Sequence, residues 1–280
     1  MRCGRYASGM AGSASQITAA IVCKDNAATI GRTLASLRGV CGSIVAVDSG
    51  SCDATVAMLE EAGARVIHSP WLGHVKTKQL ALEACATPWA LCIDSDESIE
   101  PDLATAIARG VENAPESVAG FLVNRKVYYR GRPLKYAWQP EWRCRLVRPA
   151  RARWGGVDPH DVLSVTDGST RKLKGTLRHD SFETFMQQLG KQVSYARLQA
   201  DGMHAAGTRA TKFNLLVSPG AAFLKQLVLK RAFMDGGAGW MAAACAGAQA
   251  LMKHVALLEL EQIEALSRNG SESRAPMDRG

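Results

Sequence analysis

The chain has 280 residues, of which 47% are hydrophobic and 21% are charged, an ordinary globular composition with enough apolar residues for a sizeable core. Its formal net charge of +8 is uneven: residues 125–178 carry 14 Lys and Arg against 4 Asp and Glu. This basic segment predicts an anionic partner. Nucleic acid fits the charge alone, but no nucleic-acid-binding motif is present, and we do not expect that partner.

The cysteines and the two ends of the chain narrow the class further. The eight cysteines are scattered and form no CxxC pair, which argues against a zinc site and against a disulfide framework. Reduced thiols in a cytosolic protein are the default expectation. Residues 1–15 lack the apolar core of a signal peptide, and we expect them to be disordered. Residues 267–280, rich in Ser, Arg and Gly, are also predicted to be disordered.

Strands and helical stretches are predicted to alternate through the first 124 residues. Strands are expected at 17–23, 43–47, 64–68, 89–93 and 119–123, with helices between them. This alternation predicts a doubly wound, mostly parallel α/β sheet. The sequence has no glycine-rich loop of the GxGxxG or GxxxxGKS type, so neither a Rossmann dinucleotide site nor a P-loop is supported.

Carboxylates follow two of these strands. Asp48 ends the second strand, and Asp94, Asp96 and Glu97 follow the apolar run that begins at Trp89. Ligands of open α/β sheets bind at the carboxyl ends of strands, and a divalent cation would relieve the repulsion among these acids. A solvated acidic turn explains Asp94 and Asp96 equally well, and Asp48 could instead cap a helix. Lys24, Lys76 and Lys78 are candidates to contact a diphosphate, although each could be a solvated surface lysine.

The chain from about residue 184 is predicted to be helical. Residues 211–230 mix large apolar side chains with lysines, and residues 239–258 are apolar but are interrupted by polar side chains. The second stretch falls short of a clean membrane span. Two interpretations stay open: a basic amphipathic element on an anionic leaflet, or a helical appendage that packs on the catalytic domain or on a partner.

Several segments resemble family 2 glycosyltransferases. Residues 44–56 (IVAVDSGSCDATV) are similar to the nucleotide-binding turn of that family, and residues 71–82 (WLGHVKTKQLAL) and 94–97 (DSDE) resemble two further motifs. Beyond the sheet, residues 142–149, 154–161, 177–182 and 230–240 continue the likeness in the same order. The closest branch is the lipopolysaccharide-core β-1,4-glucosyltransferase type. The sequence departs from the usual pattern at Gln79, Asp161 and Asp180.

The resemblance implies a GT-A-like fold at residues 16–180. The apolar and basic pattern that follows predicts a helical membrane-associating extension at 181–266. The resemblance also implies an inverting, metal-dependent transfer from a nucleotide-diphosphate sugar, with a UDP-sugar as the expected donor and Mg²⁺ or Mn²⁺ as the metal. The expected acceptor is a cell-envelope glycan or glycolipid such as lipopolysaccharide core. The expected location is cytoplasmic, peripheral on the inner face of the membrane. A transferase that acts on polyprenyl phosphate and a non-catalytic binding protein are the alternatives.

Roles for individual residues follow from this resemblance and from the chemistry of sugar transfer. Asp96, with Asp94, is predicted to bind the metal that neutralises the leaving diphosphate, while Asp48, Lys24, Lys78 and Asp94 bind the donor. The acceptor hydroxyl needs a carboxylate base. Asp161 replaces the acid of a family motif and is the first choice. Glu141, which could instead pair with neighbouring arginines, is the second.

Overall fold

The computed structural model describes residues 14–157 and 160–272. The contacts divide the chain into two compact units: unit 1 contains residues up to 128 and 140–180, and unit 2 contains 129–139 and the chain from 181 onward. The segments 1–13 and 273–280, where disorder was predicted, lie outside the described residues. The last helix continues to Glu272, past residue 267 where we expected the tail to begin.

Unit 1 contains one large sheet, with strands in the order β3-β2-β1-β4-β8-β6-β11-β5. Its strands are β1 (Ile17–Cys23), β2 (Ser43–Asp48), β3 (Arg65–His68), β4 (Trp89–Asp94), β5 (Glu97–Ile99), β6 (Val118–Tyr129), β8 (Trp142–Val147) and β11 (Ser169–His179). A separate hairpin pairs β9 (Ala152–Val157) with β10 (His160–Val165). The helices are α2 (Ala27–Leu37), α3 (Thr55–Glu61), α4 (His74–Glu83) and α5 (Pro101–Glu112), and η1 (Pro149–Arg151) is a short 3₁₀ turn.

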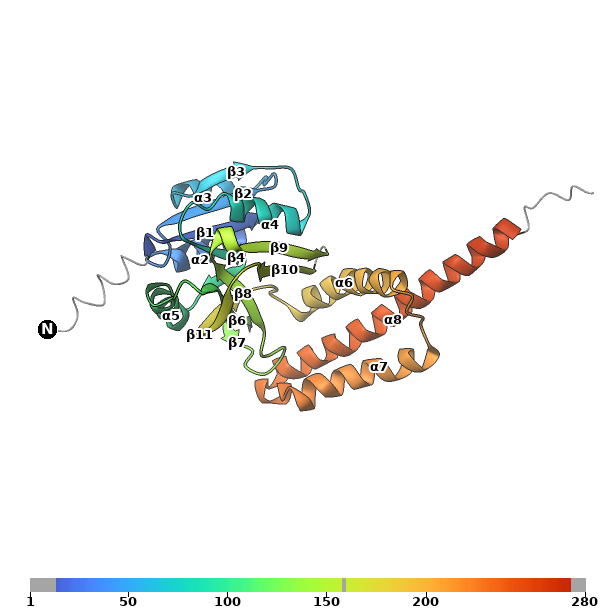
Figure 1. Cartoon of the computed structure of the whole chain (residues 1–280). Helices are drawn as coiled ribbons and strands as arrows, with labels where there is room; N and C mark the ends of the chain where they lie inside the picture. The colour runs from blue at the N-terminus through green and yellow to red at the C-terminus, as the bar shows by residue number, and fades with distance from the viewer. Residues whose placement is uncertain (1–13, 158–159, 273–280) are drawn as a thin grey trace, which may run out of the picture. The chain divides into compact units, whose positions relative to one another are not determined.

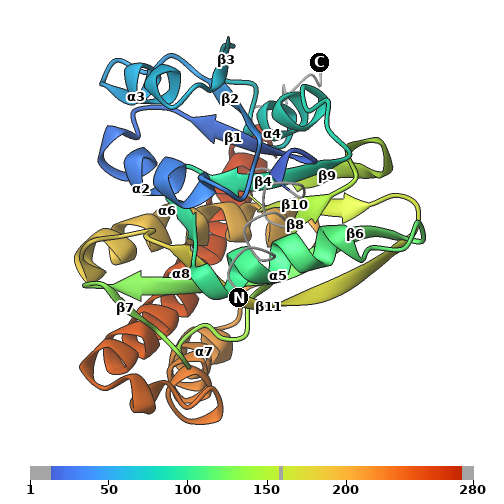
Figure 2. The ribbon, with the colours of Figure 1, turned by 90° about the vertical axis from the view of Figure 1, so that its left-hand side faces the viewer.

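The predicted α/β class is confirmed, and the sheet has two halves of different character. Strands β3, β2, β1 and β4 are all parallel, and they follow one another in Figure 2. Beyond β4 the sheet is mixed, because β8 runs antiparallel to both β4 and β6, and β5 runs antiparallel to β11. The parallel half is the part that alternating strands and helices predict. The mixed half depends on pairing between strands that are distant in sequence.

The core lies on both faces of the parallel strands. Along β4, Trp89, Leu91 and Ile93 face a core that includes side chains of α2 and α5, while Ala90 and Cys92 face a second core that includes α4 and the β9–β10 hairpin. A strand that is buried on both faces reads as a continuous apolar run, which is what the sequence shows here. The apolar packing on both sides fixes the carboxyl end of β4, where Asp94 lies.

Unit 2 contains the short strand β7 (Arg132–Pro133) and the C-terminal helices. These are α6 (Phe185–Ala205), α7 (Lys212–Leu224), the π-helical turn η2 (Lys225–Leu229), the 3₁₀ turn η3 (Ala232–Asp235) and α8 (Gly237–Glu272). Helix α8 packs against both α6 and α7 (Figure 1). By length and composition α8 could cross a membrane between Gly237 and Leu266, although 33% of its most apolar window is buried inside the protein. One such helix is weak evidence for a span.

Asp235, in the turn η3 of unit 2, binds segment 129–139 through hydrogen bonds. The carboxylate of Asp235 accepts hydrogen bonds from the backbone N–H groups of Lys135, Tyr136 and Ala137 at 2.9, 2.9 and 2.8 Å. Lys230 Nζ donates to the Gln139 carbonyl at 2.9 Å. Each of these bonds satisfies a backbone polar group of a loop that has little regular structure of its own. The loop is therefore held by a turn about 100 residues further along the chain.

Candidate functional site

The first part of the site is the pair of turns that follow β1 and β2. Cys23 and Asp48, the last residues of these strands, are register partners. The buried Asp48 carboxylate accepts hydrogen bonds from the backbone N–H groups of Gly50 and Ser51 and from the Ser51 hydroxyl. Burial opposes ionisation of Asp48, but these hydrogen bonds outweigh it and hold its pKa below the ordinary value. Asp48 therefore shapes the turn after β2, and Lys24 is exposed at the end of β1.

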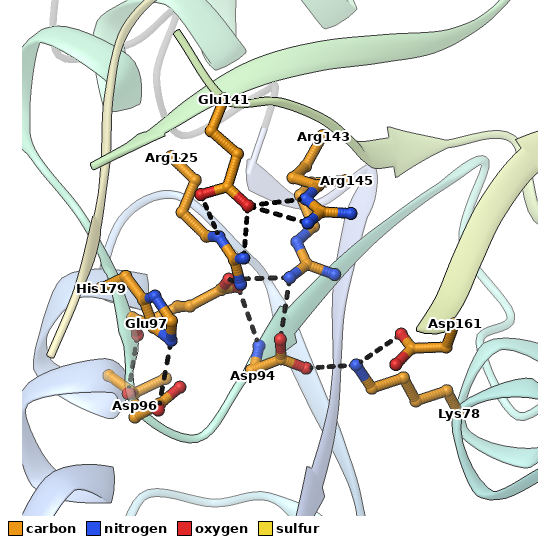
Figure 3. A network of polar contacts seen from close by, with 11 residues as sticks. Lys78, Asp94, Asp96, Glu97, Arg125, Glu141, Arg143, Arg145, Asp161 and His179 are labelled. Carbon is orange, nitrogen blue, oxygen red and sulfur yellow. Dashed lines mark hydrogen bonds and ion pairs between the residues drawn. The ribbon is translucent and has the colours of Figure 1, made fainter. Parts of the chain in front are cut away.

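Asp94, at the carboxyl end of β4, lies in a network of buried charges (Figure 3). One of its oxygens is 2.7 Å from Lys78 Nζ on α4, and the other is 2.8 Å from Arg145 Nη2 on β8. Burial would raise the pKa of Asp94, but Arg145 and Lys78 outweigh it and the pKa is lowered. The carboxylate is therefore ionised at neutral pH, and both of its oxygens are already directed at cations.

Lys78 joins Asp94 to the predicted base. Its ammonium is 2.9 Å from Asp161 Oδ2 on β10, and it lies 4.8 Å from the centre of the Trp154 ring. Lys78 is 8% exposed. Burial and Arg145 oppose its charge, but Asp94 and Asp161 outweigh them and raise the pKa of the lysine. The structure thus brings together three residues that the sequence analysis named, from three different elements.

Glu141, the second candidate base, is held by two arginines. Its carboxylate lies 2.6 Å from Arg125 Nη2 and 2.8 Å from Arg143 Nη2. Burial opposes ionisation, but the hydrogen bonds and charges of these arginines outweigh it and lower the pKa of Glu141. A carboxylate held in this way is a weaker proton acceptor than one with a single partner.

Glu97 connects the two halves of the network. It is 0% exposed, and its Oε1 lies 2.7 Å from Arg145 and 3.2 Å from Arg125. Its Oε2 accepts a hydrogen bond from the backbone N–H of Asp94 at 3.1 Å. Arg125, Arg145 and Glu97 were not named as site residues from the sequence. The acidic run that contains Glu97 was visible, but its partners come from strands more than 25 residues away.

Asp96, the predicted metal ligand, faces a histidine instead of the arginines (Figure 3). Its Oδ2 lies 3.3 Å from Nε2 of His179 at the end of β11, which the register places opposite Glu97. The segment around His179 is part of the family resemblance, but no role for this residue was predicted from the sequence. The histidine at the centre of that segment was the signal that could have found it.

The pair Asp96 and His179 fits a divalent metal as two of its ligands. Ligand atoms about 2.1 Å from an ion and at right angles lie about 3 Å apart, close to the observed separation. Within residues 14–157 and 160–272, no group of three or more His, Cys, Asp or Glu side chains is arranged to hold a metal. The remaining ligands would therefore have to come from a substrate and water. Asp94, predicted as a second metal ligand, is directed at Lys78 and Arg145.

A pocket of about 240 Å³ opens beside this network. Asp94, Asp161 and Lys78 line it, together with the rings of Trp142 and Trp154 and the side chain of Arg143. Its volume is below the 300–1,000 Å³ that is typical of sites for drug-sized ligands. We infer room for a group about the size of one sugar ring, lined by two tryptophan rings and by charged side chains.

The family model described as Glycosyl transferase family 2 matches residues 18–162. The lipopolysaccharide core biosynthesis glycosyltransferase LpsC of Rhizobium meliloti is 30% identical over 220 residues, which cover 75% of this chain and 79% of LpsC. An uncharacterized glycosyltransferase of Rickettsia typhi is 26% identical over 264 residues, covering 91% of this chain and 89% of the relative.

Solved structures with a similar course of the chain were also found. Glucosyl-3-phosphoglycerate synthase from Mycobacterium tuberculosis, in complex with Mn²⁺, UDP and glucosyl-3-phosphoglycerate, is 18% identical with a TM-score of 0.44, covering 74% of this chain and 85% of that one. TarS residues 1–349 of S. aureus, in complex with UDP-GlcNAc, is 13% identical with a TM-score of 0.43, covering 89% of this chain and 92% of that one.

Proposed function

This chain belongs to glycosyl transferase family 2 and is a glycosyltransferase, and from that premise we propose a more specific activity. We propose that it moves a sugar from a nucleotide-diphosphate donor, a UDP-sugar, to a cell-envelope glycan or glycolipid, with inversion at the anomeric carbon. The lipopolysaccharide core acceptor is supported by the similarity to LpsC, a glycosyltransferase of lipopolysaccharide core biosynthesis. The proposed location is the cytoplasm, peripheral on the inner face of the membrane.

The observation that carries the proposal is that Asp161 of the β9–β10 hairpin lies beside Asp94 and Asp96 at the carboxyl end of β4. Asp94 and Asp161 line a pocket for a small polar group, and Lys78 bridges them. Asp96 pairs with His179, and in the proposal these two side chains are metal ligands. When bound there, Mg²⁺ or Mn²⁺ would neutralise charge on the leaving diphosphate. In the proposal Asp48 and Lys24 contribute to donor binding at the neighbouring turns.

The residues of this chain have distinct parts in the transfer. Asp161 accepts the proton of the acceptor hydroxyl as that oxygen attacks the anomeric carbon. We favour Asp161 over Glu141 because Glu141 is held by Arg125 and Arg143, which lower its pKa. Lys78 and Arg145 keep Asp94 ionised and fix its carboxylate, so that it can orient hydroxyl groups of the sugar in the pocket. In the proposal, the turn that Asp48 holds through its hydrogen bonds to Gly50 and Ser51 lies beside the nucleotide.

The first experiment tests metal-dependent donor use. The purified full chain is mixed with a panel of nucleotide sugars, with Mn²⁺ or with EDTA, and both thermal stabilisation and release of the nucleotide diphosphate are measured. We expect one UDP-sugar to stabilise the protein only with metal. The variant Asp96→Ala should lose that response, and Glu116→Gln, whose side chain is 85% exposed, should keep it. Donor turnover that is unaffected by EDTA would contradict the metal role, and binding without any turnover would support the non-catalytic alternative.

The second experiment tests the base. Asp161→Asn removes the proton acceptor with little change in volume, so it should bind donor as before and lose about 10²- to 10⁴-fold in turnover. Glu141→Gln is the matched comparison, because it carries the same change on the other candidate. If Asp161→Asn transfers sugar at the wild-type rate and Glu141→Gln does not, the base is Glu141. Purified polyprenyl phosphate as a competing acceptor separates the alternative transferase from the proposed one.

A further inference from the structure

Large apolar side chains lie along the outward side of α7 and η2. The exposed large side chains recur at helical spacing, and we call them the α7 face: Phe213, Leu216, Val217, Leu224, Val228 and Leu229. Leu216 is 80% exposed and Leu229 is 77% exposed. At about 1.5 Å per residue this face extends for about 24 Å. It is a continuous stripe, and isolated apolar residues on a surface do not produce one.

The outward side of this helical segment is more apolar than that of an ordinary surface helix in water. Gln226 is 8% exposed, and among the described residues its side-chain nitrogen has no hydrogen-bond partner, while the neighbouring Leu224 and Leu229 are exposed. Surface helices ordinarily place their apolar stripe against the core and their polar residues in water. The inner side of α7 already packs against α8, so the outward stripe is not needed to hold unit 2 together.

The sequence segment that carries the α7 face has charges of one sign. Residues 202–234 contain five Lys and Arg and no Asp or Glu. Lys212 and Lys225 are exposed on the same side as the apolar side chains, and Lys230 and Arg231 follow them. Long basic side chains at the edge of an apolar stripe can direct their charges toward lipid headgroups while their stems lie on the acyl boundary. A second copy of this chain fits less well, because pairing two α7 faces would bring like charges together.

We propose that the α7 face lies in the plane of an anionic membrane surface, with its apolar side chains at the acyl boundary and Lys212 and Lys225 at the headgroups. The proposal deepens the membrane partner proposed above and rests on it. The stripe runs along the helix instead of gathering at one end, which fits a helix that lies flat. Helix α8 serves as its support, since Ala242, Ala243, Cys245 and Leu257 are buried against the other helices.

The test is flotation of the full chain with vesicles of phosphatidylcholine alone or with 30% phosphatidylglycerol. We expect binding to the anionic vesicles that salt weakens. The double variant Leu216→Ser, Leu224→Ser should bind at least about tenfold more weakly. The double variant Lys212→Glu, Lys225→Glu should lose more than about fivefold for each lysine on anionic vesicles, and much less on neutral ones. The matched control is Met186→Ser on α6, a side chain that is 75% exposed outside the α7 face, and it should bind as the wild type does.

The outcomes distinguish this proposal from its alternatives. Equal vesicle binding by the double leucine variant and the Met186→Ser control would overturn it. The face would be assigned to a second copy if the wild type does not bind vesicles and is a dimer in light scattering while the double leucine variant is a monomer. Donor turnover is measured on the same samples in solution. If turnover persists while vesicle binding is absent, this proposal fails alone; if vesicle binding persists without turnover, the proposed activity fails alone.

Discussion

In most proteins charged side chains are exposed and large apolar side chains are buried. The two units of this chain depart from this rule in opposite directions. Unit 1 buries charges: Glu97 and Arg145 are at most 5% exposed, and they join a chain of ion pairs that reaches Lys78 and Asp161. Unit 2 exposes apolar side chains along α7 and η2. Each departure is unfavourable in free energy, because unit 1 removes charges from water and unit 2 leaves apolar surface in contact with water. Both regions are therefore the places where function, more than stability, explains the residues.

The largest effect is expected from removing one charge of the buried network. Glu97→Gln keeps the volume of the side chain but leaves Arg125 and Arg145 without a shared counter-charge, so the free energy of unfolding should fall by about 3–5 kcal/mol. Urea denaturation measures it. Glu116→Gln is the matched control on an exposed carboxylate that pairs with Arg148 and Arg151, and it should cost less than about 1 kcal/mol. If Glu97→Gln and Glu116→Gln lower the free energy of unfolding equally, the buried charges of unit 1 do not differ from exposed ones.

Acid should destabilise the protein through the carboxylates of unit 1. Asp48, Asp94, Glu141 and Asp180 have folded-state pKa values below the ordinary ones, near 4, that they regain on unfolding. Their contribution is fully present above about pH 5 and is lost as pH falls through the lower folded-state values, because the unfolded chain then binds more protons. We expect the free energy of unfolding to fall from about pH 5 toward pH 3. Ser51→Ala removes the hydroxyl hydrogen bond that helps to lower the pKa of Asp48 and keeps the backbone one, so the loss of stability of this variant in acid should be smaller. A flat profile in this range would be inconsistent with the ion pairs.

The smallest effect is expected on the α7 face. Leu216→Gln should change the free energy of unfolding in solution by no more than about 0.5 kcal/mol, because the side chain is already in water. Leu227→Ala, a buried leucine of the adjoining turn η2, is the comparison and should cost about 2–5 kcal/mol. A loss for Leu216→Gln as large as for Leu227→Ala would mean that the stripe belongs to a core.

Much of unit 1 could be predicted because its signals are local. The apolar run from Trp89 to Ile93 identified a strand buried on both faces, and Asp48 and Asp94 were expected at strand ends, where the structure has them. Lys78 could not be distinguished from Lys76 by sequence, since both lie on one polar-looking helix. Only packing against the β9–β10 hairpin buries Lys78 between two carboxylates and leaves Lys76 exposed.

The rest of the candidate site depends on strands that are distant in sequence. Arg125 and Arg145 reach Glu97 because β6 and β8 enter the sheet out of sequence order, which no local pattern encodes. His179 lies beside Asp96 for the same reason, since β11 pairs with β5. In unit 2 the apolar and basic composition of residues 211–230 was visible. Which side of α7 points outward was decided by how α8 packs against it. The roles assigned to Asp48, Lys24, Asp96 and Asp161 stay predictions.

The hydrogen bonds between Asp235 and segment 129–139 have a consequence for folding during synthesis and for recombination between genes. On the ribosome, the loop emerges about 100 residues before the carboxylate that binds its backbone, so unit 2 cannot close until nearly the whole chain has been synthesised. A recombination event between residues 180 and 181 would separate the two partners. We therefore expect the catalytic sheet and the helices to be exchanged between genes as one piece, and not as independent modules.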